Sequence, residues 1–283
     1  VEFDSLRGLR YSILVDPLGA LARTMNALTR LGGNVAQSLA IPETSQRIDR
    51  LSARLGPYGV DPFGFDPQYL KGVVGPGVWV YRNYFRCETR DVQNVPNGRC
   101  IIIANHSGQL PYDAMMITMA VFLEREQPRF LRSMVERFAP TMAFVQPFLA
   151  RCGQILGTPE NCRYLLKSEE AILAFPEGTR GLNKTWGERY KLQRFGQGFM
   201  RLAIETGAPI IPCSVVGAEE QAPSVFNAQA LGELIGLPSF PVTLTPGCGL
   251  LPLPTKYRIA FGEPMVFEGD PNEEDDAIER KVD

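Results

Sequence analysis

Histidine is the scarcest reactive side chain in this sequence, since His106 is the only one among 283 residues. The six cysteines stand far apart without any CxxC pair, at Cys87, Cys100, Cys152, Cys162, Cys213 and Cys248. Zinc sites use four Cys or His ligands at short, regular spacings, so no metal centre is expected. Several of the cysteines have apolar neighbours, which is typical of buried free thiols in a reducing compartment.

Long apolar runs are absent as well, because no stretch approaches the ~18 residues that cross a bilayer. The sequence begins with Val1 rather than methionine, which leaves an upstream signal or anchor an open question. A net charge of −2, from 29 basic and 31 acidic residues, gives no reason to expect a nucleic-acid partner. There is no internal repeat. Hydrophobic residues make up 45% of the chain, enough for a full core.

Short apolar runs alternate with helical patterns from residue 84 onward. The runs predict strands from residue 84 to about 90 and at 100–104, 153–158, 171–175, 209–216 and 257–261. Helices are predicted at 113–124, 133–150, 159–170 and 195–206. This alternation predicts an α/β fold, a mostly parallel or mixed sheet covered by helices on both faces.

Outside this pattern, residues 1–75 predict an N-terminal helical appendage and linker. Leucine and methionine recur between Leu14 and Leu28 at helical spacing, and Arg23 and Arg30 lie on the opposite side. Such a basic amphipathic helix lies in a membrane interface or covers a protein core, and the sequence leaves both open. Residues 41–55 read as a polar helix, and residues 56–67 are rich in Gly, Pro and Asp, typical of a linker. We therefore expect an appendage at 1–75, the main domain at 76–267, and a solvated acidic tail at 268–283.

The segment around His106 carries the first chemical signal. Three isoleucines at 101–103 predict a buried strand, and Ser107, Gly108 and Pro111 end it. Asp113 then stands at the start of an apolar helix. A carboxylate is therefore expected to face the imidazole ring, although a structural role for both residues is the plainer alternative.

A second signal follows the strand at 171–175, in the run Pro176-Glu177-Gly178-Thr179-Arg180. A turn of this composition presents backbone N–H groups, a hydroxyl and a guanidinium together, which suits an oxyanion such as phosphate. An ordinary β-turn with a surface arginine is the alternative.

Together the two segments resemble the glycerophospholipid acyltransferase superfamily, whose bacterial prototype is 1-acylglycerol-3-phosphate acyltransferase. The resemblance covers roughly residues 84–264, including the run Ala208-Pro209-Ile210-Ile211-Pro212. It implies a glycerolipid acyltransferase-type fold, with His106 and Asp113 as catalytic residues. It further implies that Glu177, Gly178, Thr179 and Arg180 bind the acceptor substrate, with Lys184 and Arg194 as weaker reserves.

The chain departs from the family in two places. The family has four residues between its histidine and aspartate, whereas six separate His106 from Asp113. Either the loop bulges, which Gly108 and Pro111 allow, or another group orients the ring. The family's intermediate motif, which supplies an arginine, is poorly matched, and Arg151 and Arg163 are the nearest candidates.

The resemblance implies transfer of a fatty acyl group from acyl-CoA or acyl carrier protein to a lysophospholipid or glycerol phosphate acceptor, with His106 as general base. No resident cofactor is expected, because the thioester is a co-substrate. We expect a peripheral or monotopic protein on the cytoplasmic face of a membrane, with the stripe at 14–28 and the helix at 133–150 in the headgroup region. A neutral lipid acceptor and a catalytically silent lipid-binding protein are the alternatives.

Overall fold

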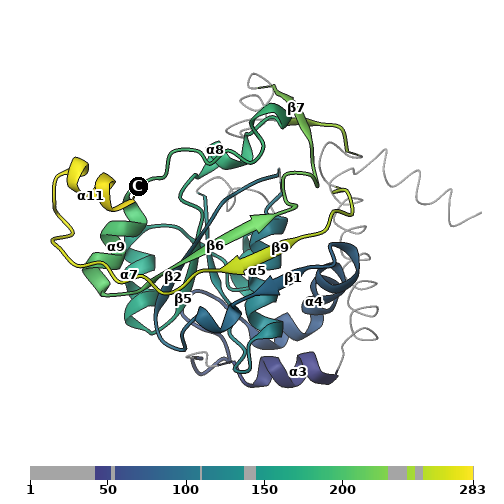
Figure 1. Cartoon of the computed structure of the whole chain (residues 1–283). Coiled ribbons are helices and arrows are strands. Elements are labelled where there is room, and N and C mark those ends of the chain that lie inside the picture. Colours follow the sequence, from purple (N-terminus) through teal and green to yellow (C-terminus); the bar gives the residue numbers. More distant parts are fainter. Residues whose placement is uncertain are drawn as a thin grey trace, which may run out of the picture.

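The computed structural model describes residues 42–51, 55–108, 110–136, 145–228, 241–245 and 251–282. A seven-stranded sheet with the order β1-β9-β6-β2-β5-β3-β4 forms its centre (Figure 1). Neighbouring strands run parallel except β6 and β9, which are antiparallel. The strands are β1 (Glu88–Arg90), β2 (Cys100–Ala104), β3 (Arg132–Val135), β4 (Ile155–Leu156), β5 (Ala171–Ala174), β6 (Ile210–Val216) and β9 (Arg258–Phe261), and a separate ribbon pairs β7 (Ser224–Asn227) with β8 (Pro241–Thr243).

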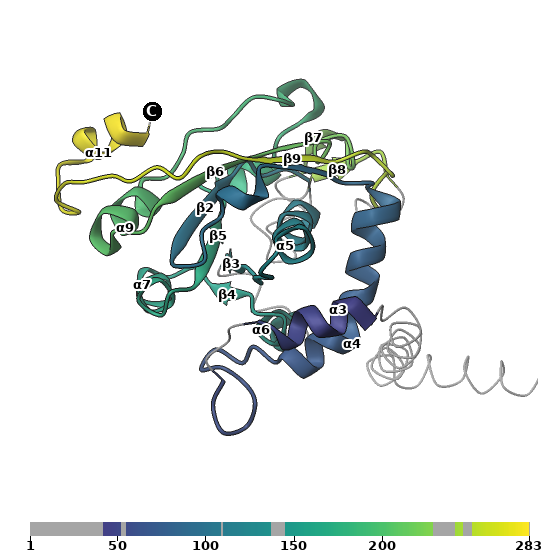
Figure 2. The same cartoon turned by 60° about the horizontal axis from the view of Figure 1, so that its bottom comes forward.

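Helices cover both faces of the sheet (Figure 2), so the predicted α/β class with a mixed sheet is confirmed. On one face α5 (Tyr112–Glu124) lies against the strands, with α3 (Pro42–Asp49) and α4 (Pro67–Trp79) packed beside it. On the other face lie α7 (Pro159–Lys167), α9 (Gly198–Thr206) and α11 (Asp275–Val282). The shorter helices are Val80–Tyr84, Val92–Asn94, α6 (Val145–Arg151), α8 (Thr179–Leu182) and Trp186–Glu188.

β2 is central and buried on both sides. Cys100, Ile102 and Ala104 contribute to the core under α5, whereas Ile101 contributes to the core under α7 and α9. This division follows from the strand period of two, which sends successive side chains to opposite faces. The β-branched run that predicts a buried strand therefore serves both cores at once, and it fixes the end of β2 from which His106 follows.

The helix predicted at 133–150 is wrong over its first residues. Residues 132–135 form β3, which pairs with β5 and β4, and residues 145–151 form the helix α6. The apolar composition of this stretch fits either structure, and pairing with distant strands decides it. Residues 137–144 lie outside the described residues.

Two further predictions differ at their edges. Buried and exposed side chains alternate from residue 84 as predicted, with Phe85 buried and Arg86 exposed. The strand β1 itself, however, begins only at Glu88. The polar helix predicted at 41–55 ends at Asp49.

The sequence analysis predicts no element at α4. The Asp66 side chain accepts a hydrogen bond from the Tyr69 N–H and caps this helix, and Pro67 occupies its first turn. Leu70, Val74 and Val78 are buried at a spacing of four, facing α5. Packing stabilises the helix despite three glycines and a proline in its interior.

The predicted solvated tail is partly folded. α11 buries Ile278 completely, and ion pairs join Arg201 to Asp275 and Arg194 to Glu279, at 2.6 Å each. The acidic composition of this segment therefore does not reveal that Ile278 is buried and packs the segment against α9.

The predicted domain boundary at residue 75 falls inside α4, and the division into an appendage and a main domain stays a prediction. The amphipathic stripe at 14–28 lies outside the described residues. Among the helices that the structure describes, none combines the length and the apolar composition needed to cross a bilayer.

Candidate active site

Asn105, the first residue of the loop that carries His106, is hydrogen-bonded to the neighbouring strand β6. Asn105 Nδ2 donates to the Val215 carbonyl at 2.9 Å, and Asn105 Oδ1 accepts from the Val215 N–H at 2.8 Å. Two hydrogen bonds to one residue of β6 continue the sheet pairing past the end of β2. His106 therefore leaves the carboxyl end of the central strand in a fixed direction, the usual place for a site in an α/β fold.

Asp113 reaches the imidazole ring despite the six intervening residues. His106 Nδ1 lies 2.7 Å from Asp113 Oδ2, and the side chains are 10% and 0% exposed, respectively. The same oxygen accepts from the Ser107 N–H at 2.9 Å, and Oδ1 accepts from the Ala114 N–H at 2.8 Å. The position of Asp113 in the first turn of α5 further stabilises its charge through the helix dipole.

Gly108 allows the bulge that the sequence analysis favours. Its φ of +83° is a conformation that residues with a side chain rarely adopt, and a Cβ there would lie 2.4 Å from Gln221 Nε2. The loop therefore folds back under Gln221, and its two ends meet at the His106–Asp113 contact.

The other face of the imidazole ring packs against an aromatic side chain. The rings of Phe175 and His106 stack with centroids 4.0 Å apart and an interplanar angle of 19°. Asp113 is the one hydrogen-bond partner of the ring among the described residues, so Nε2 is unpartnered there. Such a ring is oriented on one side and available for proton transfer on the other.

The Glu177 carboxylate supports the histidine through the backbone. Its Oε1 accepts from the His106 N–H at 2.9 Å, and Oε2 accepts from the Gln193 N–H at 2.8 Å. The residue is 1% exposed. The sequence analysis predicted Glu177 as a substrate-binding residue, whereas in the structure its carboxylate is occupied in bracing the loop.

The glycines that follow explain the composition of this turn. Gly178 has a φ of +57°, which favours glycine, and it precedes the four-residue helix α8. A Cβ on Gly181 would lie 2.9 Å from both the Cβ and the carbonyl oxygen of His106. The α8 backbone therefore lies directly against the histidine.

Arg180 is the residue before Gly181, and its side chain is exposed. It has no ion pair among the described residues, unlike the other predicted cations. Arg194 pairs with Glu279, Arg151 pairs with Asp66 at 2.9 Å, and Arg163 pairs with Glu205 at 2.7 Å. Thr179 is half-buried beside it in α8. The structure thus brings His106, Asp113, Glu177 and α8 together, but not those three arginines.

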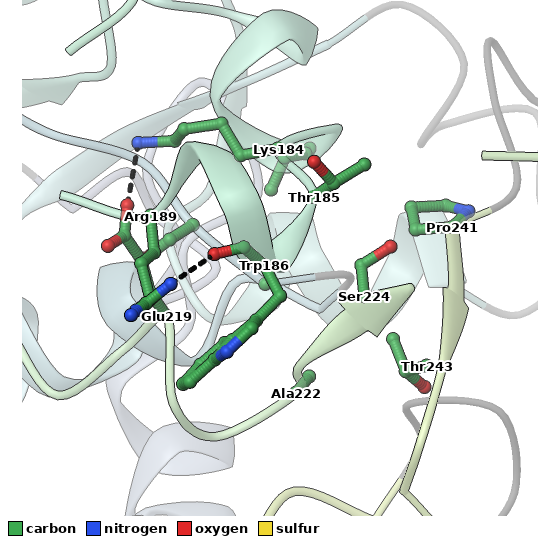
Figure 3. A pocket seen from close by; sticks show the side chains of 12 residues that line it. Lys184, Thr185, Trp186, Arg189, Glu219, Ala222, Ser224, Pro241 and Thr243 are labelled. Atoms are coloured by element: carbon green, nitrogen blue, oxygen red, sulfur yellow. Dashed lines mark hydrogen bonds and ion pairs between the residues drawn. The ribbon is translucent and has the colours of Figure 1, made fainter. Parts of the chain in front are cut away.

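Lys184 is buried between two carboxylates. Its Nζ lies 3.3 Å from Glu177 Oε2 and 2.9 Å from Glu219 Oε1, and its side chain is 5% exposed (Figure 3). Glu219 in turn accepts from the Tyr190 N–H. Sequence reasoning named Lys184 only as a reserve and missed Glu219, because nothing in the chain order links residue 219 to the other two.

A small pocket that is open to solvent adjoins the histidine loop (Figure 3). Ser107 and Gly108 contribute one wall and the helix Trp186–Glu188 contributes another through Trp186. Its remaining lining residues come from the segments around α8, β7 and β8, namely Leu182, Lys184, Thr185, Arg189, Glu219, Ala222, Ser224, Pro241 and Thr243. Most of these side chains are polar, which suits a headgroup rather than an acyl chain.

Neither Ser107 nor the cysteines in the described part of the chain are placed as nucleophiles. Burial raises the pKa of the Cys100 thiol to about 11 and that of the Cys152 thiol to about 12, so both stay protonated near neutral pH. Burial, together with the Asp113 carboxylate, also raises the pKa of the Cys213 thiol. Ser107 Oγ is buried without a hydrogen-bond partner among the described residues. Within the same residues, no group of three or more His, Cys, Asp or Glu side chains is arranged to hold a metal ion.

A family model described as "Acyltransferase" matches residues 86–216. An uncharacterized protein of Mycobacterium tuberculosis is 40% identical over 217 residues, which cover 74% of this chain and 61% of that protein. The match thus spans about three fifths of the length of that relative. An uncharacterized protein of Mycobacterium leprae is 35% identical over 277 residues, covering 92% of this chain and 76% of that protein.

More distant matches carry functional names. A probable 1-acyl-sn-glycerol-3-phosphate acyltransferase of Mycoplasma genitalium is 25% identical over 167 residues, covering 56% of this chain and 59% of that protein. The crystal structure of the 1-acyl-sn-glycerophosphate acyltransferase PlsC from Thermotoga maritima matches with a TM-score of 0.49 and 16% identity, covering 92% of each chain.

Proposed function

The chain belongs to the acyltransferase family, and on that premise we propose that it moves a fatty acyl group from acyl-CoA or acyl carrier protein to a hydroxyl of a glycerophospholipid precursor such as lysophosphatidic acid. The observation that carries the proposal is the contact of His106 Nδ1 with the buried Asp113 carboxylate at 2.7 Å. It leaves one ring nitrogen available at the end of the central strand, and the name of the Mycoplasma genitalium relative supports the acceptor class.

In the proposed reaction His106 is the general base. Nε2 takes the proton of the acceptor hydroxyl while that oxygen attacks the thioester carbonyl. The carbon–sulfur bond then breaks, the thiolate leaves, and the imidazolium returns the proton to the sulfur. General base catalysis of this kind contributes on the order of a hundred- to ten-thousandfold. The acyl donor is consumed as a co-substrate, and the reaction as proposed uses no resident cofactor.

Asp113 is proposed to hold the ring in the productive tautomer. With Nδ1–H donating to Oδ2, the second nitrogen has its lone pair free, and the carboxylate stabilises the imidazolium that forms. Its other hydrogen bonds, from the N–H groups of Ser107 and Ala114, fix the carboxylate in place.

For the acceptor, we propose that Arg180 binds the phosphate. Its guanidinium fork can hold two phosphate oxygens, and it is exposed on α8 beside the histidine. Gly178 and Thr179 shape the turn that presents it, and Glu177 positions the loop. Holding the acceptor near the base supplies further rate, because it makes the encounter local.

A neutral lipid acceptor is the second candidate, and the state of Lys184 favours it. This lysine lines the pocket, but its charge is shared by Glu177 and Glu219 and is not available to a phosphate. If the acceptor headgroup occupies the pocket, an uncharged glycerol or diacylglycerol hydroxyl fits the lining as well as a phosphate does.

Both proposed substrates are amphiphiles, so we further propose that the protein works as a peripheral or monotopic protein at the cytoplasmic face of a membrane. Its substrates then reach the site from the bilayer.

The test is thiol release from acyl-CoA, with lysophosphatidic acid or diacylglycerol as acceptor. We expect release with lysophosphatidic acid, and a loss of a hundredfold or more on His106→Ala. Gly198→Ala is the control, because a Cβ at this position meets no atom within 4 Å, and it should stay close to wild type.

Each other outcome has one meaning. Release only with diacylglycerol supports the neutral acceptor. No thiol release by the wild type with either acceptor, from acyl-CoA or from acyl carrier protein, supports a catalytically silent lipid-binding protein. Equal release from wild type and His106→Ala would contradict the role of the histidine.

A further inference from the structure

The connection between β6 and β9 is unusual in its charge. From Gln221 to Thr255 it contains one charged residue, Glu233, although 21% of the whole chain is charged. Within this connection the structure describes β7, β8 and the segment 251–255. Charged side chains normally keep surface segments solvated, and this connection has almost none. Its exposed apolar side chains therefore indicate a surface that binds something other than water.

Those exposed side chains are large and apolar. We call them, with one tryptophan at the end of α4, the hairpin patch: Trp79, Val225, Phe226, Leu244, Leu251 and Leu253 are 48%, 53%, 54%, 75%, 62% and 38% exposed, respectively. Val225 and Phe226 are consecutive in β7, at an irregularity in its pairing with β8, and both side chains are more than half exposed. Single exposed apolar residues are ordinary, but six on adjoining segments are not.

Contacts between these segments make the hairpin patch continuous. Tyr84 OH donates to the Pro252 carbonyl at 2.5 Å, and the Tyr84 ring lies 6.1 Å from that of Trp79. The Leu244 N–H donates to the Pro223 carbonyl beside β7. The apolar side chains thus come from three stretches of chain but form one surface.

The hairpin patch borders the histidine loop. The Leu253 N–H donates to the Gln221 carbonyl at 2.7 Å, and Gln221 covers Gly108. Ser224, the first residue of β7, lines the pocket together with Ser107. A molecule held on the hairpin patch therefore lies next to the pocket and to Gly108, which follows His106 by two residues in the sequence.

Cations stand at the edges of this apolar surface. Arg82 is exposed one turn after Trp79 and has no ion pair among the described residues. Exposed Arg86 donates to the Pro254 carbonyl, and Arg189 stacks on the pocket residue Trp186. Exposed leucines and phenylalanine with tryptophan and arginine at the border are the composition of surfaces that enter the headgroup region of anionic membranes.

We propose that the hairpin patch is the surface by which the protein docks on a lipid bilayer, with the pocket and His106 facing the headgroups. This inference rests on the proposed function, because an acyltransferase acting on lipids needs a bilayer beside its pocket. A bilayer fits better than a protein partner, because exposed leucines, phenylalanine and tryptophan with arginines at their border match the acyl region and the anionic headgroups of a membrane.

Co-sedimentation of the full chain with vesicles of phosphatidylcholine and phosphatidylglycerol tests the proposal. The variant combines Phe226→Ser, Leu244→Ser and Leu251→Ser, three exposed changes outside the proposed catalytic machinery. We expect vesicle binding to weaken at least tenfold, since each apolar side chain lost from the bilayer removes a favourable transfer term. Hydrolysis or transfer of a water-soluble short-chain thioester should remain at the wild-type rate.

The matched control combines Tyr58→Ser, Met265→Ser and Val266→Ser, which change equally exposed side chains away from the hairpin patch. It should bind vesicles as the wild type does. Equal binding by wild type and the hairpin-patch variant would overturn the proposal, and so would self-association of the wild type without vesicle binding. Vesicle binding needs no turnover, so its loss in the variant supports the docking surface even if the acyl transfer assay fails, and thermal unfolding verifies that the variant is folded.

Discussion

Gly181→Ala is a single-methyl change that tests the geometry around His106. The added Cβ would lie 2.9 Å from the His106 Cβ and from its carbonyl oxygen, and 3.1 Å from the Glu177 Cβ. These are backbone atoms or atoms next to the backbone, so no flexible side chain can move aside. The two segments that carry the predicted site residues must separate instead.

The size of the effect follows from these distances. A carbon at 2.9 Å is about 0.6 Å closer than the ordinary contact of about 3.5 Å, so His106 and α8 must part by about that amount. Overpacking of this kind costs about 1–3 kcal/mol in unfolding free energy, offset by up to ~1 kcal/mol because alanine favours helix more than glycine does. A displacement of 1 Å in a catalytic group costs about a hundredfold, so we expect kcat/KM to fall about tenfold or more.

Steady-state acyl transfer and urea unfolding, measured on the same preparations, separate the two effects. Gly198→Ala is the control, because a Cβ at this first position of α9 meets no atom within 4 Å and should leave both quantities near wild type. Wild-type kcat/KM in Gly181→Ala would refute the reasoning, since it would mean that α8 does not set the position of His106.

Three further predictions concern charge. Lys184→Met should lower the unfolding free energy by about 3–5 kcal/mol, because it leaves the buried carboxylates of Glu177 and Glu219 without the cation that balances their charge; urea unfolding checks this, and a loss below ~1 kcal/mol contradicts it. Arg180→Ala should raise the acceptor KM about tenfold or more with kcat largely kept, as initial rates over an acceptor series will show, unless the exposed guanidinium never meets the phosphate. The folded chain raises the pKa of the Cys100 thiol from 9.0 to about 11 by burial, so this proton is lost from the unfolded chain first, and the stabilisation present below pH 9 disappears as the pH rises to 11. The stability difference between wild type and Cys100→Ala should therefore shrink by about 3 kcal/mol over that range, and a constant difference would contradict the shift.

Most of the sheet could be predicted from local pattern. The isoleucine run of β2, the apolar strand β5 and the helix at Asp113 all agree with the structure, because a buried strand and an apolar helix declare themselves over a few residues. β3 could not be predicted, since Arg132–Val135 become a strand only through pairing with β5 and β4. α4 escaped because its glycines and proline hide the apolar spacing, although Asp66 before Pro67 is a helix start signal that could have found it.

The candidate site shows the same division. The contact between His106 and Asp113 was expected from two short segments and is present, whereas their catalytic roles stay a prediction. Glu177 was assigned by resemblance to the substrate, but its carboxylate holds the His106 backbone, a role visible only in three dimensions. Glu219 and Phe175 complete the surroundings of the site. No motif links Glu219 to the histidine, and although Phe175 begins the run Phe175-Pro176-Glu177-Gly178-Thr179-Arg180, its stacking on the imidazole ring is visible only in three dimensions.

Because hydrogen bonds hold both ends of the loop from His106 to Asp113, the number of residues between these ends can vary. Asn105 at one end of the loop is hydrogen-bonded to β6, and Asp113 at the other end belongs to the first turn of α5. The positions of His106 and Asp113 are therefore set by β6 and α5 and not by the residues between them. Added residues there would lengthen the loop beside Gln221, while the contacts of Asn105 with β6 and the start of α5 kept their places. A search of proteomes that demands a fixed count between the two residues would overlook chains of this kind, whereas one that asks for a strand end facing a helix start would recover them.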